Sequence, residues 1–168
     1  MSSSASLRPL LGLVVATVIF LAAGPRASSP PETIKSIQAT LPDSVSLDGK
    51  VVYVDFWASW CVPCRSSFPW MQDIHERFRD RGLVIVAVDV DKDSKAAQKF
   101  LKDNGADFPV IFDPKGELAE QYGLEVMPSS FIYDRSGRLV TQHQGFARDE
   151  TDGLERTLAK LLNEGTSH

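Results

Sequence analysis

The chain has 168 residues, of which 43% are hydrophobic and 24% are charged. These values are typical of a folded globular protein, and the length favours one domain with a sizeable core over two. The formal net charge is −4, and no run of Lys and Arg forms a basic stretch. We therefore expect no nucleic-acid partner, because such a partner requires a concentrated basic surface.

Residues 1–29 are expected to precede the folded domain, which we place at residues 30–168. After Arg8, residues 10–23 form an apolar run that Gly24 and Pro25 interrupt. This run matches the hydrophobic region of a secretory signal and is shorter than the roughly 20 residues that span a bilayer. We interpret it as a cleaved signal peptide or as an N-terminal anchor in the inner membrane. Both interpretations place the domain outside the cytoplasm, as in the periplasm.

The apolar periodicity of the remaining chain predicts alternating strands and helices. Strands are expected at residues 51–57, 83–88, 109–112, 130–133 and 138–142, the last two joined by a turn at 134–137. Helices are expected at residues 62–81, at 94–104, from a cap at Asp113 with Pro114 in first position to about Gly123, and at about 149–162. This order predicts an α/β fold with a mixed central sheet, whose first strand–helix–strand unit is parallel and right-handed.

The two cysteines of the chain, Cys61 and Cys64, fall where the first predicted strand gives way to its helix. A disulfide between cysteines so close in the chain closes almost no loop, so it would add little stability. The start of a helix offers free backbone N–H groups and the positive end of the helix dipole, which favour a thiolate. We therefore predict that Cys61 attacks disulfides and that Cys64 resolves the mixed disulfide. Pro63 is expected to stiffen the turn between them.

A zinc half-site is the main alternative for this pair. Structural zinc usually has four Cys or His ligands at set spacings. The three histidines, His75, His143 and His168, are scattered without such a spacing. We therefore predict no metal site, and no cofactor other than a redox-active Cys61–Cys64 disulfide.

The cysteine segment resembles the thioredoxin superfamily. Residues 54–65 read Val-Asp-Phe-Trp-Ala-Ser-Trp-Cys-Val-Pro-Cys-Arg, and Pro69 follows. The export segment, Gly49-Lys50, the insert around residues 89–104 and the segment 126–134 narrow the resemblance to TlpA/ResA-like periplasmic thiol–disulfide oxidoreductases. The resemblance covers roughly residues 33–162. It implies a thioredoxin-like fold with helices on both faces of the sheet and a TlpA-like insert.

The resemblance also implies a substrate-binding surface around the cysteines. Pro128 matches the cis-proline that lies against the CxxC and offers backbone groups to a substrate strand. Met127 precedes it and is expected to touch the disulfide, although simple core packing explains it equally well. Trp60 matches the aromatic residue that borders the reactive sulfur, and Pro63 completes the set.

Asp55 is the third catalytic candidate. Strand alternation places it on the same face as Val51 and Tyr53, where a carboxylate is costly without a partner or a task. By resemblance it matches the buried acid of thioredoxin, which is thought to accept the proton of the resolving cysteine. Burial should raise its pKa. Proton transfer and a neutral, hydrogen-bonded core acid both remain open. Ser67 stands where the ResA-like branch has a functional glutamate, so a glutamate-assisted mechanism is not implied.

Three functions are compatible with these features. The first is a reductase of oxidised extracytoplasmic proteins, such as cytochrome c apoproteins during cytochrome c maturation. The second is an oxidase that introduces disulfides, and the third is an assembly factor that holds copper(I) on the cysteines. The Val-Pro pair between the cysteines and the TlpA-like resemblance favour the reductase. Because the chain has no second cysteine pair to gather electrons, a membrane-embedded thiol donor is also expected.

Overall fold

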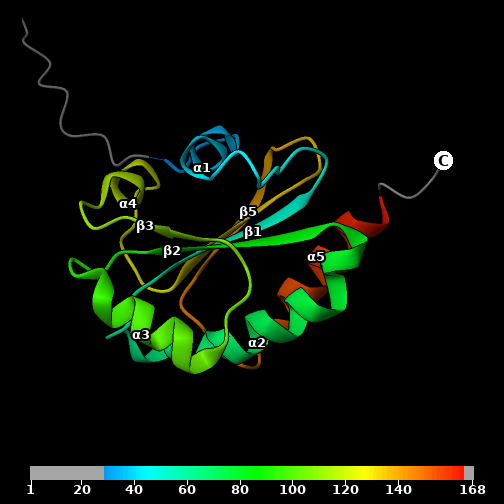
Figure 1. Ribbon diagram of the computed structural model, residues 1–168. Helices are drawn as coiled ribbons and strands as arrows, with labels where there is room; N and C mark the ends of the chain where they lie inside the picture. Colours follow the sequence, from blue (N-terminus) through cyan, green and yellow to red (C-terminus); the bar gives the residue numbers. More distant parts are fainter. Residues whose placement is uncertain (1–28, 165–168) are drawn as a thin grey trace, which may run out of the picture.

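The computed structural model describes residues 29–164 (Figure 1). The expected signal or anchor segment lies outside these residues, apart from Ser29. Within residues 29–164, no helix is both long enough and apolar enough to cross a membrane.

A mixed sheet forms the centre of the described chain. Its strands are β1 (Val51–Trp57), β2 (Leu83–Asp89), β3 (Val110–Phe112), β4 (Ser129–Tyr133) and β5 (Leu139–Gln144). They lie in the order β3-β2-β1-β4-β5. Strand β2 runs parallel to β1 and β3, whereas β4 runs antiparallel to β1 and β5. The predicted mixed sheet is therefore confirmed.

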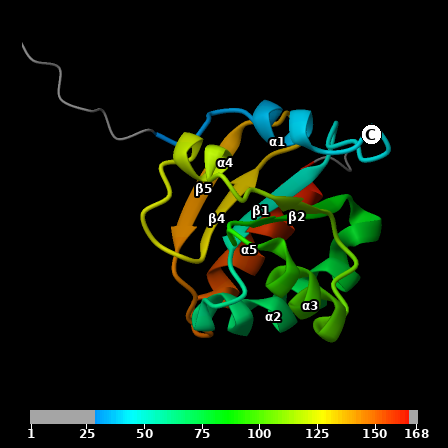
Figure 2. The ribbon, with the colours of Figure 1, turned by 60° about the vertical axis from the view of Figure 1, so that its left-hand side comes forward.

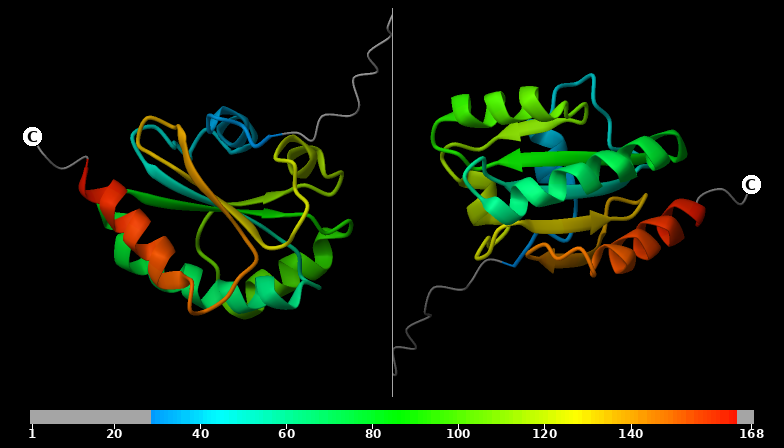
Figure 3. Two further views of the ribbon diagram at one scale, coloured as in Figure 1. Left: turned by 180° about the vertical axis from the view of Figure 1, so that it is seen from behind. Right: turned by 90° about the horizontal axis from the view of Figure 1, so that it is seen from below.

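Helices cover both faces of the sheet. They are α1 (Lys35–Thr40), α2 (Val62–Phe78), α3 (Ser94–Asn104), α4 (Glu117–Gln121) and α5 (Thr151–Asn163). Helices α1 and α4 lie on one face, and α2, α3 and α5 lie together on the other (Figures 1, 2 and 3). This is the expected arrangement, and α3 lies within the segment where the resemblance places the TlpA-like insert.

Strand β1 is buried on both faces because its side chains alternate between two cores. Val52 and Val54 join the core under α1 and α4, whereas Tyr53 and Trp57 join the core under α2, α3 and α5. All of β1 is buried. The strand therefore has no solvent-facing side, and any polar side chain within it is enclosed by apolar neighbours.

Helix α4 begins later than the sequence analysis predicts. Residues 113–116 form a turn, closed by the Gly116 N–H donating to the Asp113 carbonyl at 3.0 Å. Gly116 has a φ of +73°, which favours glycine. The Asp113 carboxylate still accepts the N–H groups of Glu117 and Ala119, each at 2.9 Å. The prediction was therefore right about the capping side chain and wrong about Pro114, which lies in the turn before the helix.

Helix α1 was not predicted. It is six residues long, has no side-chain cap and no acidic residue in its first turn, and buries only Ile37. Such a helix leaves no start signal and hardly any periodicity in the sequence. Its position depends on Gln38, whose side chain donates to the Val45 carbonyl at 3.0 Å and accepts the Leu47 N–H at 2.8 Å.

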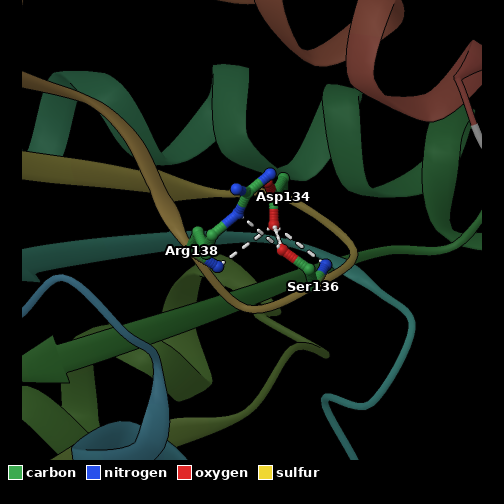
Figure 4. Close-up of polar contacts among 3 residues, drawn as sticks. All are labelled: Asp134, Ser136 and Arg138. Carbon is green, nitrogen blue, oxygen red and sulfur yellow. Dashed lines mark hydrogen bonds and ion pairs between the residues drawn. The ribbon is translucent and has the colours of Figure 1, made fainter.

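The turn between β4 and β5 is held by its own side chains (Figure 4). Asp134 Oδ1 accepts the backbone N–H groups of Ser136 at 2.9 Å and Arg138 at 3.1 Å, together with the Ser136 hydroxyl. The Arg138 guanidinium pairs with Asp134 Oδ2 at 3.2 Å. Gly137 has a φ of +74°. The predicted hairpin-like turn is confirmed.

Candidate active site

The cysteines lie at the edge of the sheet where β1 ends. After Trp57, the chain turns through residues 58–61, and the Cys61 N–H donates to the Ala58 carbonyl at 3.1 Å. The Val90 N–H donates to the Trp57 carbonyl at 3.0 Å, which extends the parallel pairing of β1 and β2 past the last strand residues. Reaction sites of open α/β sheets lie at this carboxyl edge.

Cys61 and Cys64 form a disulfide across the first turn of α2. Cys61 occupies the N-cap position of the helix, and Pro63 lies in its first turn. The Cys64 N–H donates to Cys61 Sγ at 3.3 Å. Cys61 is 6% exposed, whereas Cys64 is fully buried. Only Cys61 is therefore reachable from solvent, and a helix N–H stands ready to stabilise its thiolate once the disulfide is reduced.

The surface beside Cys61 is apolar and exposed. Trp60 is 66% exposed and Val62 is 71% exposed. Val126 is also exposed, and Met127 packs against the core cluster that includes both cysteines. The Met127–Pro128 peptide bond is cis, as the resemblance implies.

Asp55 is enclosed in the middle of the sheet. It is 1% exposed, lies opposite Ser130 of β4, and accepts the Tyr53 hydroxyl on Oδ1 at 3.5 Å. Its Oδ2 has no hydrogen-bond partner among residues 29–164. Burial raises the pKa of Asp55 to about 8, and the hydrogen bond from Tyr53 acts in the opposite direction. The titration of this carboxyl is therefore brought close to neutral pH, where most of it still holds its proton.

Ser67 carries no ionisable group into this region. It is 1% exposed, and its hydroxyl donates to the Cys64 carbonyl at 2.8 Å. The hydroxyl is thus bonded within its own helix. Asp55 is the buried acid on the strand that leads directly to the cysteines.

A pocket of about 350 Å³ flanks α2 on the side of α5. It is lined by Ser66, Pro69, Trp70, Phe146, Arg148 and Thr151. Trp70 is held in place by Glu155 of α5, which accepts its indole N–H at 2.9 Å, and by the ring of Tyr53, which lies edge-on to it at a centroid distance of 5.6 Å. The Gly145 N–H donates to the Pro128 carbonyl at 2.7 Å, which links the strand end before this pocket to the cis-proline segment.

Two acidic residues of this edge were missed as site candidates. Asp91 Oδ2 accepts the Ser59 N–H at 2.9 Å, and Asp89 Oδ1 accepts the Asp91 N–H at 3.3 Å. Both are buried. Their signal was present in the sequence, because acids at the end of a buried strand beside the cysteine strand must lie at the same sheet edge. Within residues 29–164, no group of three or more His, Cys, Asp or Glu side chains could hold a metal ion.

Comparison with known proteins agrees with this geometry. The family model named Redoxin matches residues 32–158. The thiol–disulfide oxidoreductase ResA of Bacillus thuringiensis subsp. konkukian is 34% identical over 113 residues, which are 67% of this chain and 64% of that protein. The ResA of Bacillus subtilis is 35% identical over 94 residues, 56% of this chain and 52% of the relative. The chain thus spans less than two thirds of the length of these relatives.

Solved structures extend the similarity to the fold. A crystal structure of a candidate thiol:disulfide interchange protein, DsbE, from Chlorobium tepidum is 45% identical, with a TM-score of 0.67. That match covers 69% of this chain and 82% of the other. StoA from Bacillus subtilis is 27% identical with a TM-score of 0.55, covering 62% of this chain and 80% of its own.

Proposed function

The chain belongs to the redoxin family, as a TlpA/ResA-like member of the thioredoxin superfamily, and on this premise we propose that it is an extracytoplasmic thiol–disulfide oxidoreductase that reduces protein disulfides. The observation that carries the proposal is the asymmetric disulfide at the start of α2. One cysteine, Cys61, is partly exposed and lies between the exposed side chains of Trp60 and Val62, and the other, Cys64, is fully buried. An exchange cycle needs this division between an attacking and a resolving thiol.

The proposed cycle moves two electrons. The reduced Cys61 thiolate attacks one sulfur of a substrate disulfide, which forms a Cys61–substrate bond and releases the other sulfur as a thiolate. Cys64 loses its proton and attacks Cys61 Sγ, which forms the Cys61–Cys64 disulfide and releases the second substrate sulfur. The substrate gains two electrons, and the protein is left oxidised. The Cys64 N–H, which faces Cys61 Sγ in the oxidised form, stabilises the Cys61 thiolate at the start of each cycle.

In this cycle Asp55 accepts the proton of Cys64. It is the enclosed acid of the strand that leads to the cysteines, and its raised pKa brings its titration close to neutral pH. The proton goes to Asp55 in the fraction of molecules in which its carboxyl is ionised, and a pKa this close to neutral pH lets the carboxyl release the proton again. Its unpartnered Oδ2 supports this role over that of a fully hydrogen-bonded core acid.

Substrates bind at Trp60, Pro63 and Met127, next to Pro128, which is itself buried. Exposed apolar side chains next to the reactive cysteine, including Val62, suit a substrate that binds as an extended, unfolded segment. An unfolded protein with an oxidised CxxC pair presents such a segment. Apocytochromes c, which carry this pair at the haem attachment site, are the substrates that we propose.

The site of action follows from the N-terminal segment. A signal or anchor places the domain in the periplasm or its equivalent, where disulfides form. A reductase in that compartment must be reduced again after each turnover. With two cysteines in the chain, both used in the reaction, we propose that a membrane-embedded dithiol protein supplies the electrons.

The decisive experiment traps the covalent intermediate. The Cys64→Ser variant, incubated with a peptide that contains an oxidised CxxC pair, should accumulate a mixed disulfide through Cys61, and Cys61→Ser should form none. Equilibration of the wild-type couple with glutathione should give a reduction potential nearer to about −270 mV than to about −120 mV. A potential above about −160 mV would support an oxidase instead, and a mixed disulfide formed through Cys64 in the Cys61→Ser variant would reverse the assigned roles.

A further inference from the structure

A carboxylate from another part of the chain holds the turn that carries Cys61. Asp91 follows β2 and is 4% exposed. Its Oδ2 accepts the Ser59 N–H at 2.9 Å. Ser59 lies inside the turn that the Cys61 N–H closes on the Ala58 carbonyl. A single buried carboxylate is therefore bonded to the middle of the turn that presents Trp60 and the reactive sulfur.

The backbone of Asp91 is held in place by a second buried acid, Asp89. Asp89 is 1% exposed, pairs with Trp57 in the parallel register, and accepts the Asp91 N–H on Oδ1 at 3.3 Å. Burial raises the pKa of Asp89 to about 7, the Asp91 N–H acts in the opposite direction, and the Asp91 carboxylate adds to the rise. A partly protonated Asp89 reduces the repulsion between the two acids. The Asp91 carboxylate is thus held in position to accept the Ser59 N–H.

We propose that Asp91 is a positioning residue for the attack by Cys61, acting through the Ser59 N–H. The inference rests on the proposed thiol–disulfide exchange. In that attack the Cys61 sulfur must approach along the axis of the substrate disulfide, so that one S–S bond forms as the other breaks and the leaving sulfur departs with the bonding electron pair. A turn that is free to rotate loses this alignment. A displacement of about 1 Å at a reacting centre can lower a rate by roughly 100-fold.

The chain offers a matched control two residues away. Asp93 also accepts a backbone N–H, that of Lys95 at 3.1 Å, but it caps α3 on the surface and does not bond to the cysteine turn. Replacing Asp93 removes one carboxylate and one capping bond from the same loop. It therefore reproduces the loss of charge and of local stability without releasing Ser59.

The test measures how fast the reduced protein attacks a small aromatic disulfide, 5,5′-dithiobis(2-nitrobenzoate), by stopped flow across the pH range of thiol titration. We expect Asp91→Ala to lower the limiting rate constant by about 10-fold. Asp91→Asn should stay within about threefold of the wild type, because its amide oxygen accepts the same N–H. Asp93→Ala should react at the wild-type rate. Thermal melts of all three variants accompany the kinetics.

The outcomes separate the inference from the proposed function. A wild-type rate in Asp91→Ala overturns the inference, as does equal slowing in Asp91→Asn and Asp91→Ala. If Asp91→Ala does not fold, Asp91→Glu replaces it: the longer side chain displaces the carboxylate, so slowing relative to Asp91→Asn supports the inference and equal rates overturn it. A wild-type protein that shows no Cys61-dependent reaction refutes the proposed function itself.

Discussion

The two edges of the central sheet at which the strands begin and end carry different kinds of polar side chain. At the edge away from the cysteines, Arg135 donates to the carbonyls of Gly49 at 2.8 Å, Arg81 at 2.9 Å and Leu162 at 3.2 Å. One guanidinium thereby joins the start of β1, the end of the α2 region and the end of α5, although its Nε has no hydrogen-bond partner among residues 29–164. At the cysteine edge, β1 buries the Asp55 carboxylate, whose Oδ2 has no hydrogen-bond partner among residues 29–164, and Trp60 is exposed to solvent.

This difference indicates which edge is arranged for stability and which for reaction. Bonds from one side chain to three chain segments stabilise a fold because they tie together parts of the chain that are far apart in the sequence. A buried acid with a free oxygen costs stability, and an exposed tryptophan gains none from burial. Such features are retained where a proton must move or a partner must bind. The comparison therefore predicts separable effects: substitutions at the cysteine edge should change rates, and substitutions at the far edge should change stability.

The largest effect at the cysteine edge is expected from Asp55→Asn. The amide keeps the size of the side chain but cannot take the Cys64 proton. Resolution of the mixed disulfide should slow by about 10- to 100-fold, since proton transfer by a positioned group contributes at least this much. The initial attack by Cys61 should keep its rate. Rapid-quench trapping of the mixed disulfide measures both steps, and the control is the same Asp-to-Asn change at an exposed site, Asp80→Asn, just before β2.

The same substitution should stabilise the fold at alkaline pH. The folded protein holds the Asp55 proton up to a pKa of about 8, whereas the unfolded chain releases it near 3.8. The free energy of unfolding of the wild type therefore falls as the pH rises from about 4 to about 8. Asp89, with a pKa raised to about 7, contributes a fall of the same sign.

Asp55→Asn removes only the Asp55 share of that fall. At pH 8 the variant should be more stable than the wild type by at least about 1 kcal/mol in urea melts, and the advantage should shrink toward pH 5. An unchanged resolution rate together with a large loss of stability would identify Asp55 as a core hydrogen-bonding residue and would remove the contrast between the edges.

At the far edge, Arg135→Ala should cost about 2–3 kcal/mol of unfolding free energy, because it removes three hydrogen bonds to three chain segments. The rate of disulfide exchange should not change. Gly82→Ala is expected to weaken the same contact from the other side: a Cβ there would lie 2.8 Å from the Arg135 guanidinium, at a φ of +95°. Urea melts and stopped-flow rates on the same samples decide the matter, and a slowed exchange in Arg135→Ala would contradict the separation of the edges.

Most of the fold could be predicted from the sequence because burial leaves a periodic pattern. Strand β1 is found as an apolar run that only Asp55 interrupts. Helix α3 begins and ends at the predicted residues because Asp93 caps it and Gly105 stops it in the left-handed conformation. Helix α1 escaped prediction because one buried side chain makes no period. The start of α4 was misplaced because Asp113 caps the helix from across a turn, which no local rule distinguishes from direct capping.

The site could be predicted only where it is local in the chain. Cys61 and Cys64 identify themselves by spacing, and Asp55 by its polarity within an apolar strand. The bond from Asp91 to Ser59 joins residues 32 positions apart, and its existence depends on how β2 pairs with β1. The sequence pattern indicates that Asp91 and the cysteine turn share one edge of the sheet, but it does not show the register that brings Asp91 to Ser59.

The smallest effects are expected in the β4–β5 turn. They test whether hydrogen bonds to the backbone or the ion pair between Arg138 and Asp134 stabilise the far edge. Arg138 is 75% exposed, so Arg138→Ala should cost no more than about 0.5 kcal/mol, as exposed ion pairs usually do. Asp134→Ala should cost about 1–2 kcal/mol, because it frees two backbone N–H groups as well as the Ser136 hydroxyl. Both variants should exchange disulfides at the wild-type rate. Urea melts at low and high salt distinguish the two contributions: the Arg138 effect should vanish at about 1 M salt, and the Asp134 effect should persist. Equal losses in the two variants would show that the ion pair, and not the bonds to the backbone, holds the turn.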